Sequence, residues 1–335
     1  MHIPDNYLSP ATCAVMGTAM VPVWTKSVKK VKEEISREKI PLLGIGAAFS
    51  FLFMMFNVPL PGGTTGHAVG GTLLAILMGP YAACISVTVA LLIQALLFGD
   101  GGILAFGANC FNMAFVLPFL GYYIYRLVRD RAKTVNGEYA GMALGAYVGL
   151  NSAALLAAIE FGLQPLLFHD SAGQPLYCPY SLSVSIPAMT IPHLLVAGIV
   201  EAAFTVAVAA FIKRISPGTL YEGAKKKTKA VYGLILVLIC LTPLGLLATG
   251  TAWGEWGAEE IAEVVSGGNA LGYVPKGMAD GFRFEAVMPD YAVGGMPEVT
   301  GYILSAVAGA AILIIFFKII SALIKDKAGN KIGKS

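Results

Sequence analysis

The sequence has little charge and almost no histidine. Only 13% of its 335 residues are charged and only four are histidine, whereas about 25% of the residues of a soluble globular protein are charged. Hydrophobic residues make up 56% of the chain, and they come mostly in runs of about 17–25, the length that crosses a bilayer. The runs are continuously apolar, which excludes the alternating strands of an outer-membrane barrel. The composition therefore predicts an all-α polytopic membrane protein.

Patterns for several other functions are missing. The five cysteines are far apart and form no CxxC pair, so we expect neither a disulfide framework nor a zinc site. The enzyme motifs HExxH and GxSxG are absent, and no secretory signal precedes the first apolar stretch. The tail GNKIGKS is one residue short of a P-loop and follows no strand. We therefore expect no enzyme, no ATP site and no nucleic-acid partner.

Nine apolar segments are predicted to cross the membrane. They cover about residues 7–24, 40–60, 66–79, 82–98, 104–125, 139–161, 184–212, 230–250 and 299–323. The third and fourth are separated only by Gly79-Pro80, so residues 66–98 form either a hairpin or one broken helix.

Lysine and arginine predict the orientation of these segments. All but two of the 23 lie in the loops after the first, fifth and seventh segments, or at the end of the last segment and in the tail. Only Lys276 and Arg283 fall on the other side. The positive-inside rule makes the basic side cytoplasmic, so we expect the N-terminus outside and the C-terminus inside. Residue 2, the loop VPLPGGTTGHAVGG, the turn GDGG at 99–102 and the long loop 251–298 then share the exterior side.

The chain start MHIPDNYLSP offers an unusual set of metal donors. Because the second residue is bulky, we expect Met1 to be retained. Its amine nitrogen, the amide nitrogen of His2 and the ring nitrogen of His2 can close two chelate rings around one metal. His67 in the exterior loop is the candidate fourth donor. A square-planar set of nitrogen ligands favours Ni²⁺ or Cu²⁺, so Met1, His2 and His67 are the predicted metal ligands.

The sequence around these donors suits close packing of the backbone. Five glycines (Gly62, Gly63, Gly66, Gly70 and Gly71) surround His67, and glycine allows positive φ and close approach. Pro4 biases Ile3 toward an extended form. Asn109 and Asn112, in GANCFNM, are either hydrogen-bond donors to a metal-bound imidazole or interhelical hydrogen bonds.

Other polar groups receive structural interpretations. His193 and Glu201 lie eight residues apart in one apolar segment, and we favour a hydrogen-bonded anchor over metal ligation for them. We expect Glu160 at a membrane interface and His169 at the surface. Asp100 in the GDGG turn is predicted to be a turn former rather than a ligand.

Taken together, these motifs resemble a known family. MHIPDNYLSP, GHAVGG, ALLIQALLFGDGGI, GANCFNM and PHLLVAGIVEAAFT, over roughly residues 1–215, are similar to the NikM/CbiM substrate-binding component of nickel and cobalt energy-coupling-factor (ECF) transporters. The resemblance implies a metal site built from the terminal amine, the amide and ring nitrogens of His2, and His67. It also implies a prokaryotic cell membrane, a transmembrane coupling subunit of NikQ/CbiQ type and ATP-binding subunits of NikO/CbiO type. Small residues between Gly141 and Ala158 would suit helix docking.

The last third resembles a second component of such systems. Residues 230–335 give two segments around the exterior loop 251–298 and look like a fused NikN/CbiN-type subunit, although PDYAVGG differs from the expected PDGLE-type motif. Residues 216–229 form the basic linker. The acidic residues Glu255, Glu259, Glu260 and Glu263 either gather cations or cover the metal entry, or form an ordinary solvated short helix, which we favour.

The resemblance implies a substrate-capture subunit that binds Ni²⁺ or Co²⁺ from outside, embedded in membrane lipid. The first alternative is a stand-alone secondary metal carrier or channel. The second is a membrane enzyme or a structural scaffold. The choice between Ni²⁺ and Co²⁺ stays open, because nitrogen donors alone form the predicted ligand set.

Overall fold

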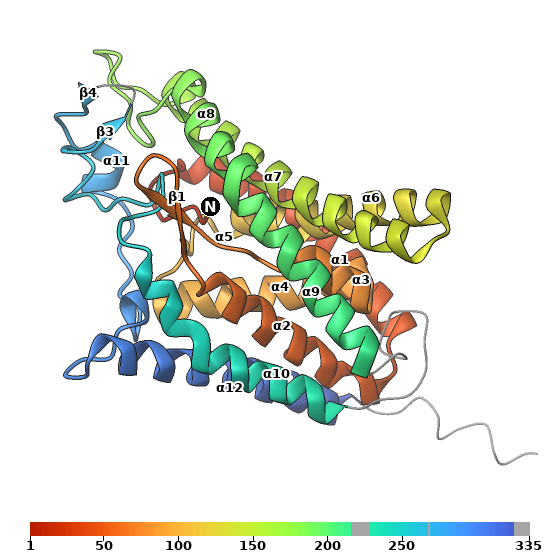
Figure 1. Ribbon diagram of the computed structural model, residues 1–335. Coiled ribbons are helices and arrows are strands. Elements are labelled where there is room, and N and C mark those ends of the chain that lie inside the picture. The colour runs from red at the N-terminus through yellow and green to blue at the C-terminus, as the bar shows by residue number, and fades with distance from the viewer. Residues whose placement is uncertain (216–227, 267–268, 325–335) are drawn as a thin grey trace, which may run out of the picture.

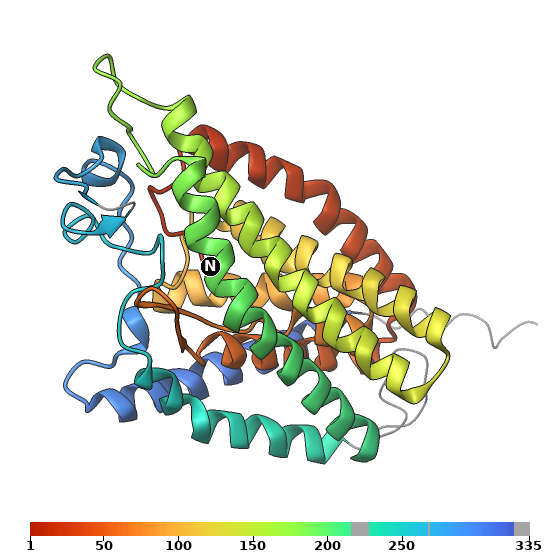
Figure 2. The ribbon, with the colours of Figure 1, turned by 45° about the horizontal axis from the view of Figure 1, so that its top comes forward.

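The computed structural model describes residues 1–215, 228–266 and 269–324. Most of the predicted linker 216–229 and the whole tail 329–335 lie outside the described residues. Figures 1 and 2 show long helices lying side by side, with loops gathered at one end. The elements in chain order are α1 (Pro10–Glu34), η1 (Arg37–Lys39), α2 (Ile40–Met54), β1 (Val58–Leu60), β2 (Thr64–Gly66), α3 (Gly71–Met78), α4 (Pro80–Ile93), η2 (Gln94–Phe98), α5 (Phe106–Asn109), η3 (Cys110–Val116), α6 (Leu117–Ala132), α7 (Val135–Leu167), α8 (Leu182–Pro192), η4 (His193–Ala197), α9 (Gly198–Ile215), α10 (Thr228–Leu241), η5 (Thr242–Leu247), β3 (Val265–Ser266), β4 (Asn269–Ala270), α11 (Lys276–Ala279), η6 (Pro289–Tyr291) and α12 (Glu298–Leu323).

Five helices in the described part of the chain are long and apolar enough to cross a membrane: Pro80–Phe98, Phe106–Ala132, Val135–Leu167, Leu182–Arg214 and Glu298–Leu323. Three of them contain π-helical stretches, η2, η3 and η4, in which the helix carries an extra residue in the turn. The helical class is therefore as expected, while the count of nine crossings and the orientation stay predictions.

Residues 66–98 form a hairpin with one short arm. Helix α3 has eight residues, so at 1.5 Å per residue it is about 12 Å long and cannot cross a core of about 30 Å. Gly79 ends it with φ 87°, and α3 packs against α4, which means that the chain turns back there. The predicted segment 66–79 therefore consists of α3 and, before it, the loop that carries His67.

Glycines bring several helices into close contact. A Cβ added to Gly145 in α7 would lie 2.4 Å from the carbonyl oxygen of Gly121 in α6, and one added to Gly309 in α12 would lie 2.3 Å from the ring of Phe51 in α2. The small residues of α7 therefore pack largely inside the chain, and the expectation that they form a docking surface for another subunit is wrong for Gly145.

The loops and the basic helix ends lie at opposite ends of the molecule. The β1–β2 hairpin, α11 and the β3–β4 hairpin share one end, while the α6–α7 connection and the C-terminal end of α9 lie at the other (Figure 1). The N-terminus enters among the helices near the first end (Figure 2). This arrangement brings together four regions that are distant in sequence: the chain start, the loop that carries His67, the turn 99–102 and the loop that carries Glu255.

Candidate metal centre

The first residues of the chain form a buried extended segment. Met1, His2 and Ile3 are 3%, 1% and 0% exposed. The main-chain N–H of Ile3 donates to Oδ1 of Asn109 at 2.8 Å, and Nδ2 of Asn109 donates to the Ile3 carbonyl at 3.0 Å. The N–H of Gly102 donates to the same carbonyl at 2.8 Å. These three bonds fix the main chain beside His2.

Side chains of the following residues hold the segment in register. The Asp5 carboxylate accepts from the main-chain N–H groups of Ile103 and Leu104, at 3.0 and 2.7 Å. Gly102 has no room for a side chain, because an added Cβ would lie 2.5 Å from the Asp5 nitrogen. Ser9 then caps α1 by accepting from the N–H of Thr12. The glycine-rich turn 99–102 is therefore shaped around the inserted terminus.

Glu201 fixes the loop that carries His67. Its carboxylate accepts from the main-chain N–H of Val69 at 2.7 Å and from that of Gly70 at 3.0 Å. Gly70 has φ 72°, a left-handed conformation that glycine adopts without strain. The expectation that Glu201 is a hydrogen-bonded anchor is confirmed, and its target is the loop two residues after His67.

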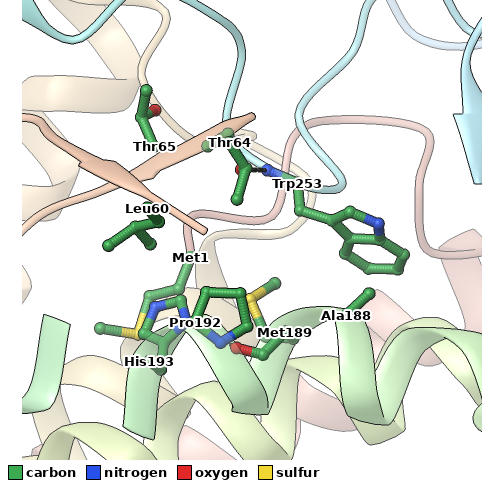
Figure 3. A pocket seen from close by; sticks show the side chains of 10 residues that line it. Met1, Leu60, Thr64, Thr65, Ala188, Met189, Pro192, His193 and Trp253 are labelled. Atoms are coloured by element: carbon green, nitrogen blue, oxygen red, sulfur yellow. Dashed lines mark hydrogen bonds between the residues drawn. The ribbon is translucent and has the colours of Figure 1, made fainter. Parts of the chain in front are cut away.

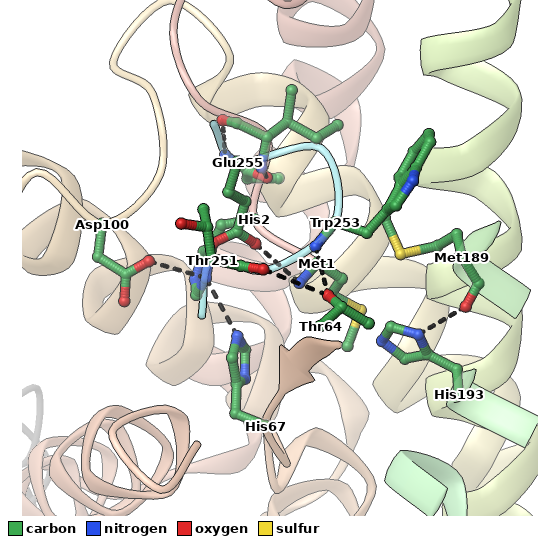
Figure 4. A network of polar contacts seen from close by, with 12 residues as sticks. Met1, His2, Thr64, His67, Asp100, Met189, His193, Thr251, Trp253 and Glu255 are labelled. Atoms are coloured by element: carbon green, nitrogen blue, oxygen red, sulfur yellow. Dashed lines mark hydrogen bonds and ion pairs between the residues drawn. The ribbon is translucent and has the colours of Figure 1, made fainter. Parts of the chain in front are cut away.

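The two predicted histidine ligands meet across the centre. His67 Nε2 lies 3.2 Å from His2 Nδ1, and His67 Nδ1 lies 3.2 Å from the carbonyl oxygen of Ala68 (Figure 4). A carbonyl only accepts, so His67 Nδ1 carries the proton and Nε2 presents its lone pair to His2. Burial, then the charge of the terminal amine and the neighbouring His2 ring, hold the pKa of His67 well below its usual value. His67 is therefore a neutral imidazole, the form that binds metals.

Asp100 contacts His2, which sequence reasoning did not predict. Its Oδ1 lies 3.0 Å from His2 Nδ1, while Oδ2 accepts from Gln94 and from the Tyr291 hydroxyl. Burial raises the pKa of Asp100, but the neighbouring His2 and His67 and the Tyr291 hydroxyl lower it further, so the net shift is well downward. Asp100 lies in the turn 99–102, as expected, and in addition pairs with His2. An acid on the predicted exterior side, in a chain with few charges, was the available signal.

Part of the long C-terminal loop covers the terminal amine. The nitrogen of Met1 lies 3.0 Å from Oε1 of Glu255, whose side chain is 21% exposed. The main-chain N–H of Trp253 donates to Thr64 Oγ1 at 2.7 Å, joining the loop to the β1–β2 hairpin (Figure 4). The expectation of a solvated short helix here is wrong, since 259–263 form turns. The loop bonds partly to itself, since the N–H groups of Glu260 and Ile261 donate to the Gly257 carbonyl, and partly to the β1–β2 hairpin through Trp253.

Main-chain nitrogen is needed to complete a metal site here. In residues 1–215, 228–266 and 269–324, no group of three or more His, Cys, Asp or Glu side chains is arranged to hold a metal. The terminal amine, the His2 amide and two imidazoles can supply four nitrogens instead. His2 Nδ1 carries a proton that it shares between Asp100 and His67, so this nitrogen can bind a metal only when that proton moves to the other ring nitrogen.

The remaining candidates lie away from the two histidine rings. Asn112 donates to the buried Glu160 at 3.0 Å, so it holds an interhelical contact, and Glu160 is not at an interface. Asn109 binds the main chain of Ile3 rather than an imidazole. His169 is exposed, as expected, and His193 lines a separate cavity.

Two family models match this chain. The model of the cobalt uptake substrate-specific transmembrane region matches residues 2–219, and the model of the PDGLE domain matches residues 227–326. The chain belongs to the cobalt-uptake family. The resemblance inferred from its N-terminal motifs is thereby confirmed, and so is the likeness of the last third to a NikN/CbiN-type component, despite its PDYAVGG sequence.

Full-length relatives share both regions. The probable fused nickel transport protein LarMN of Lactiplantibacillus plantarum is 54% identical over 95% of this chain and 97% of its own. The fused nickel transport protein NikMN of Rhodobacter capsulatus is 46% identical over 94% of this chain and 95% of its own. Family membership and the apolar helices identify a multi-pass prokaryotic membrane protein.

A crystal structure of a truncated transition metal transporter resembles the first region of this family member. It is 60% identical, with a TM-score of 0.61, and the match covers 64% of this chain and 99% of that chain.

Proposed function

We propose that this chain is the substrate-capture subunit of an ATP-driven ECF-type importer and that it binds Ni²⁺, or Co²⁺, from outside the cell. Its family is named for cobalt uptake, and two fused relatives are named as nickel transport proteins. The observation that carries the proposal is the 3.2 Å approach of His67 Nε2 to His2 Nδ1 beside the buried terminal amine.

The ligand set is four nitrogens in a square plane. The Met1 amine and the His2 amide lose their protons to the metal, and the His2 ring moves its proton from Nδ1 to Nε2. Because Nε2 of His2 is buried and has no partner in the described structure, this tautomer change breaks no hydrogen bond at that atom. Square-planar nitrogen coordination favours Ni²⁺ among the metals that the family names suggest.

Each proposed domain has its own role. Residues 1–215 hold the metal, and residues 230–335 form a NikN/CbiN-like unit whose loop 251–298 covers the site. Residues 216–229 link these two domains. The basic helix ends face the cytoplasm in this orientation, where a NikQ/CbiQ-type coupling subunit and NikO/CbiO-type ATPases would act on them.

Isothermal titration of the purified full chain with NiCl₂ tests the capture site. We expect one tight equivalent when the chain starts at Met1. A chain extended by one residue before Met1 replaces the amine with an amide and should lose at least about a thousandfold in affinity, the order expected when several donors of a chelate are lost. The same residue added after Ser335 is the control. Equal affinity of the two chains would overturn the role of the amine.

Reconstitution tests the energy source. Uptake of ⁶³Ni by proteoliposomes should require the coupling subunit and ATPases together with this chain. Uptake by this chain alone would instead favour a stand-alone carrier.

A further inference from the structure

A second cavity lies on the other side of Met1 from His67. Its lining includes Met1, Thr64, Met189, His193 and Trp253, which come from the chain start, the β1–β2 hairpin, the α8–η4 junction and the C-terminal loop (Figure 3). The terminal amine faces the metal centre, while the thioether of the same residue points into this cavity beside the His193 ring (Figures 3 and 4). Met1 therefore joins the two spaces.

His193 presents an unused lone pair to this cavity. The residue is 3% exposed, and its Nδ1 lies 2.7 Å from the carbonyl oxygen of Met189. Because a carbonyl accepts only, Nδ1 carries the proton and Nε2 is unprotonated. Nε2 is buried and has no hydrogen-bond partner in the described structure. A backbone carbonyl that fixes one ring nitrogen while the other stays open is the arrangement of a metal-binding histidine.

The helix geometry supports a site at this position. His193 is the first residue of the π-helical stretch η4, which interrupts the long helix Leu182–Arg214. Such single π turns are rare and are frequent at functional sites.

We propose that His193 Nε2, together with the thioethers of Met1 and Met189, forms a second and weaker station for the transported divalent metal. This proposal rests on the proposed function. One imidazole and two thioethers bind Ni²⁺ or Co²⁺ less tightly than a four-nitrogen chelate, and a transport path needs sites that a metal can leave. Complete transfer replaces four metal–nitrogen bonds by one bond to His193 Nε2 and two bonds to thioether sulfurs, and the Met1 amine and the His2 amide take back protons from water; His193 itself gives up no proton.

A ligand that assists transfer changes rates and leaves the equilibrium at the main site unchanged. Stopped-flow mixing of the full chain with NiCl₂ should therefore show that His193→Gln lowers both association and dissociation rates by about tenfold. The Ni²⁺ affinity of the first equivalent should stay within about threefold. The matched control is His169→Gln, a change at the exposed histidine.

Three outcomes of this experiment are decisive. Unchanged rates in His193→Gln would overturn the station. Complete loss of tight binding would make His193 part of the main site, which also contradicts the proposal. A wild-type chain without a tight equivalent would instead refute the proposed function, so the two failures are distinguishable.

A second measurement applies even where His193→Gln fails to fold. Excess NiCl₂ should load a weaker second equivalent in the wild type and quench the emission of Trp253, which lines the cavity. Trp253→Phe should remove the optical signal and keep the stoichiometry. A single equivalent in the wild type at saturating Ni²⁺ would overturn the station.

Discussion

Two regions of the chain reach the same centre by different means. The segment of residues 1–9 is held by main-chain bonds to Asn109 and Gly102 and is almost fully buried. The loop around Trp253 and Glu255 reaches it mainly through side chains of residues 1–215. Thr64 accepts from the Trp253 N–H, the Tyr7 hydroxyl donates to the Trp256 carbonyl, and the partly exposed Glu255 carboxylate pairs with the terminal amine. A segment fixed by its own backbone can hold donors in a set geometry, whereas the loop lies over that segment. The first region therefore suits ligands, and the second suits a cover.

The largest expected effect on Ni²⁺ affinity comes from pH, because two of the proposed donors in the N-terminal segment must lose a proton to bind the metal. In the proposed site, metal binding releases two protons, one from the Met1 amine and one from the His2 amide. Wherever the amine carries its proton, each unit of lower pH should therefore weaken Ni²⁺ binding by about a hundredfold. His67 adds no third proton, because its pKa is held well below its usual value by burial, then by the charge of the terminal amine and the neighbouring His2 ring.

Titration calorimetry between pH 6 and pH 8, in two buffers of different ionisation enthalpy, measures both the slope and the proton count. A slope near zero would show that the amine and amide are not ligands.

The next largest effect on Ni²⁺ affinity is expected when a proposed donor is removed. His67→Ala removes one of four proposed nitrogens and should lower Ni²⁺ affinity by about a hundredfold, within the range for losing a metal-binding group. His169→Ala, at the exposed surface, should leave it unchanged. Titration calorimetry measures both variants, and intact binding by His67→Ala would place the metal elsewhere.

A smaller effect is expected when the anchor of the His67 loop is weakened. Glu201→Gln leaves one acceptor oxygen for the two N–H groups of Val69 and Gly70. An unpaired buried N–H costs about 1–3 kcal/mol, which should lower the unfolding temperature and reduce Ni²⁺ affinity by about tenfold through misplacement of His67.

Thermal unfolding with and without NiCl₂ tests this claim. Glu298→Gln, at the exposed start of α12, is the matched control. Equal behaviour of the two variants would contradict the anchoring role.

The smallest effect is expected in the cover. Glu255→Gln removes the ion pair with the terminal amine, which must break when the amine binds a metal. Exposed or partly exposed pairs contribute about 0–1 kcal/mol, so Ni²⁺ affinity should rise by no more than about fivefold, while the chain without metal becomes slightly less stable. A fall in affinity would mean that Glu255 is itself a ligand. The change Glu259→Gln, in the exposed turn nearby, is the control.

The sequence predicted the ligand segment better than its surroundings. The spacing of amine, amide and imidazole in Met1-His2 is local chemistry, and family resemblance added His67. The contacts of Asp100 with His2 and of Glu255 with the terminal amine were not predicted, because they join positions 98 and 254 residues apart along the chain. Residues 66–79 were expected to cross the membrane because hydropathy does not distinguish a buried loop and short helix from a spanning helix. The boundaries of α12 were close to the predicted 299–323, because this helix coincides with one long apolar run.

In the π-helical turns, the number of residues determines which way the rest of the helix faces, and no substitution of a side chain can have the same effect. Each turn adds a residue to its helix, and removing one residue from a helix rotates all that follows by about 100°. A deletion within η4, even of the exposed Leu195, would turn the face of α9 that carries Glu201 away from the loop of His67. An ordinary spanning helix can thus acquire an inward-facing anchor such as Glu201 through the insertion of one residue, rather than through a substitution.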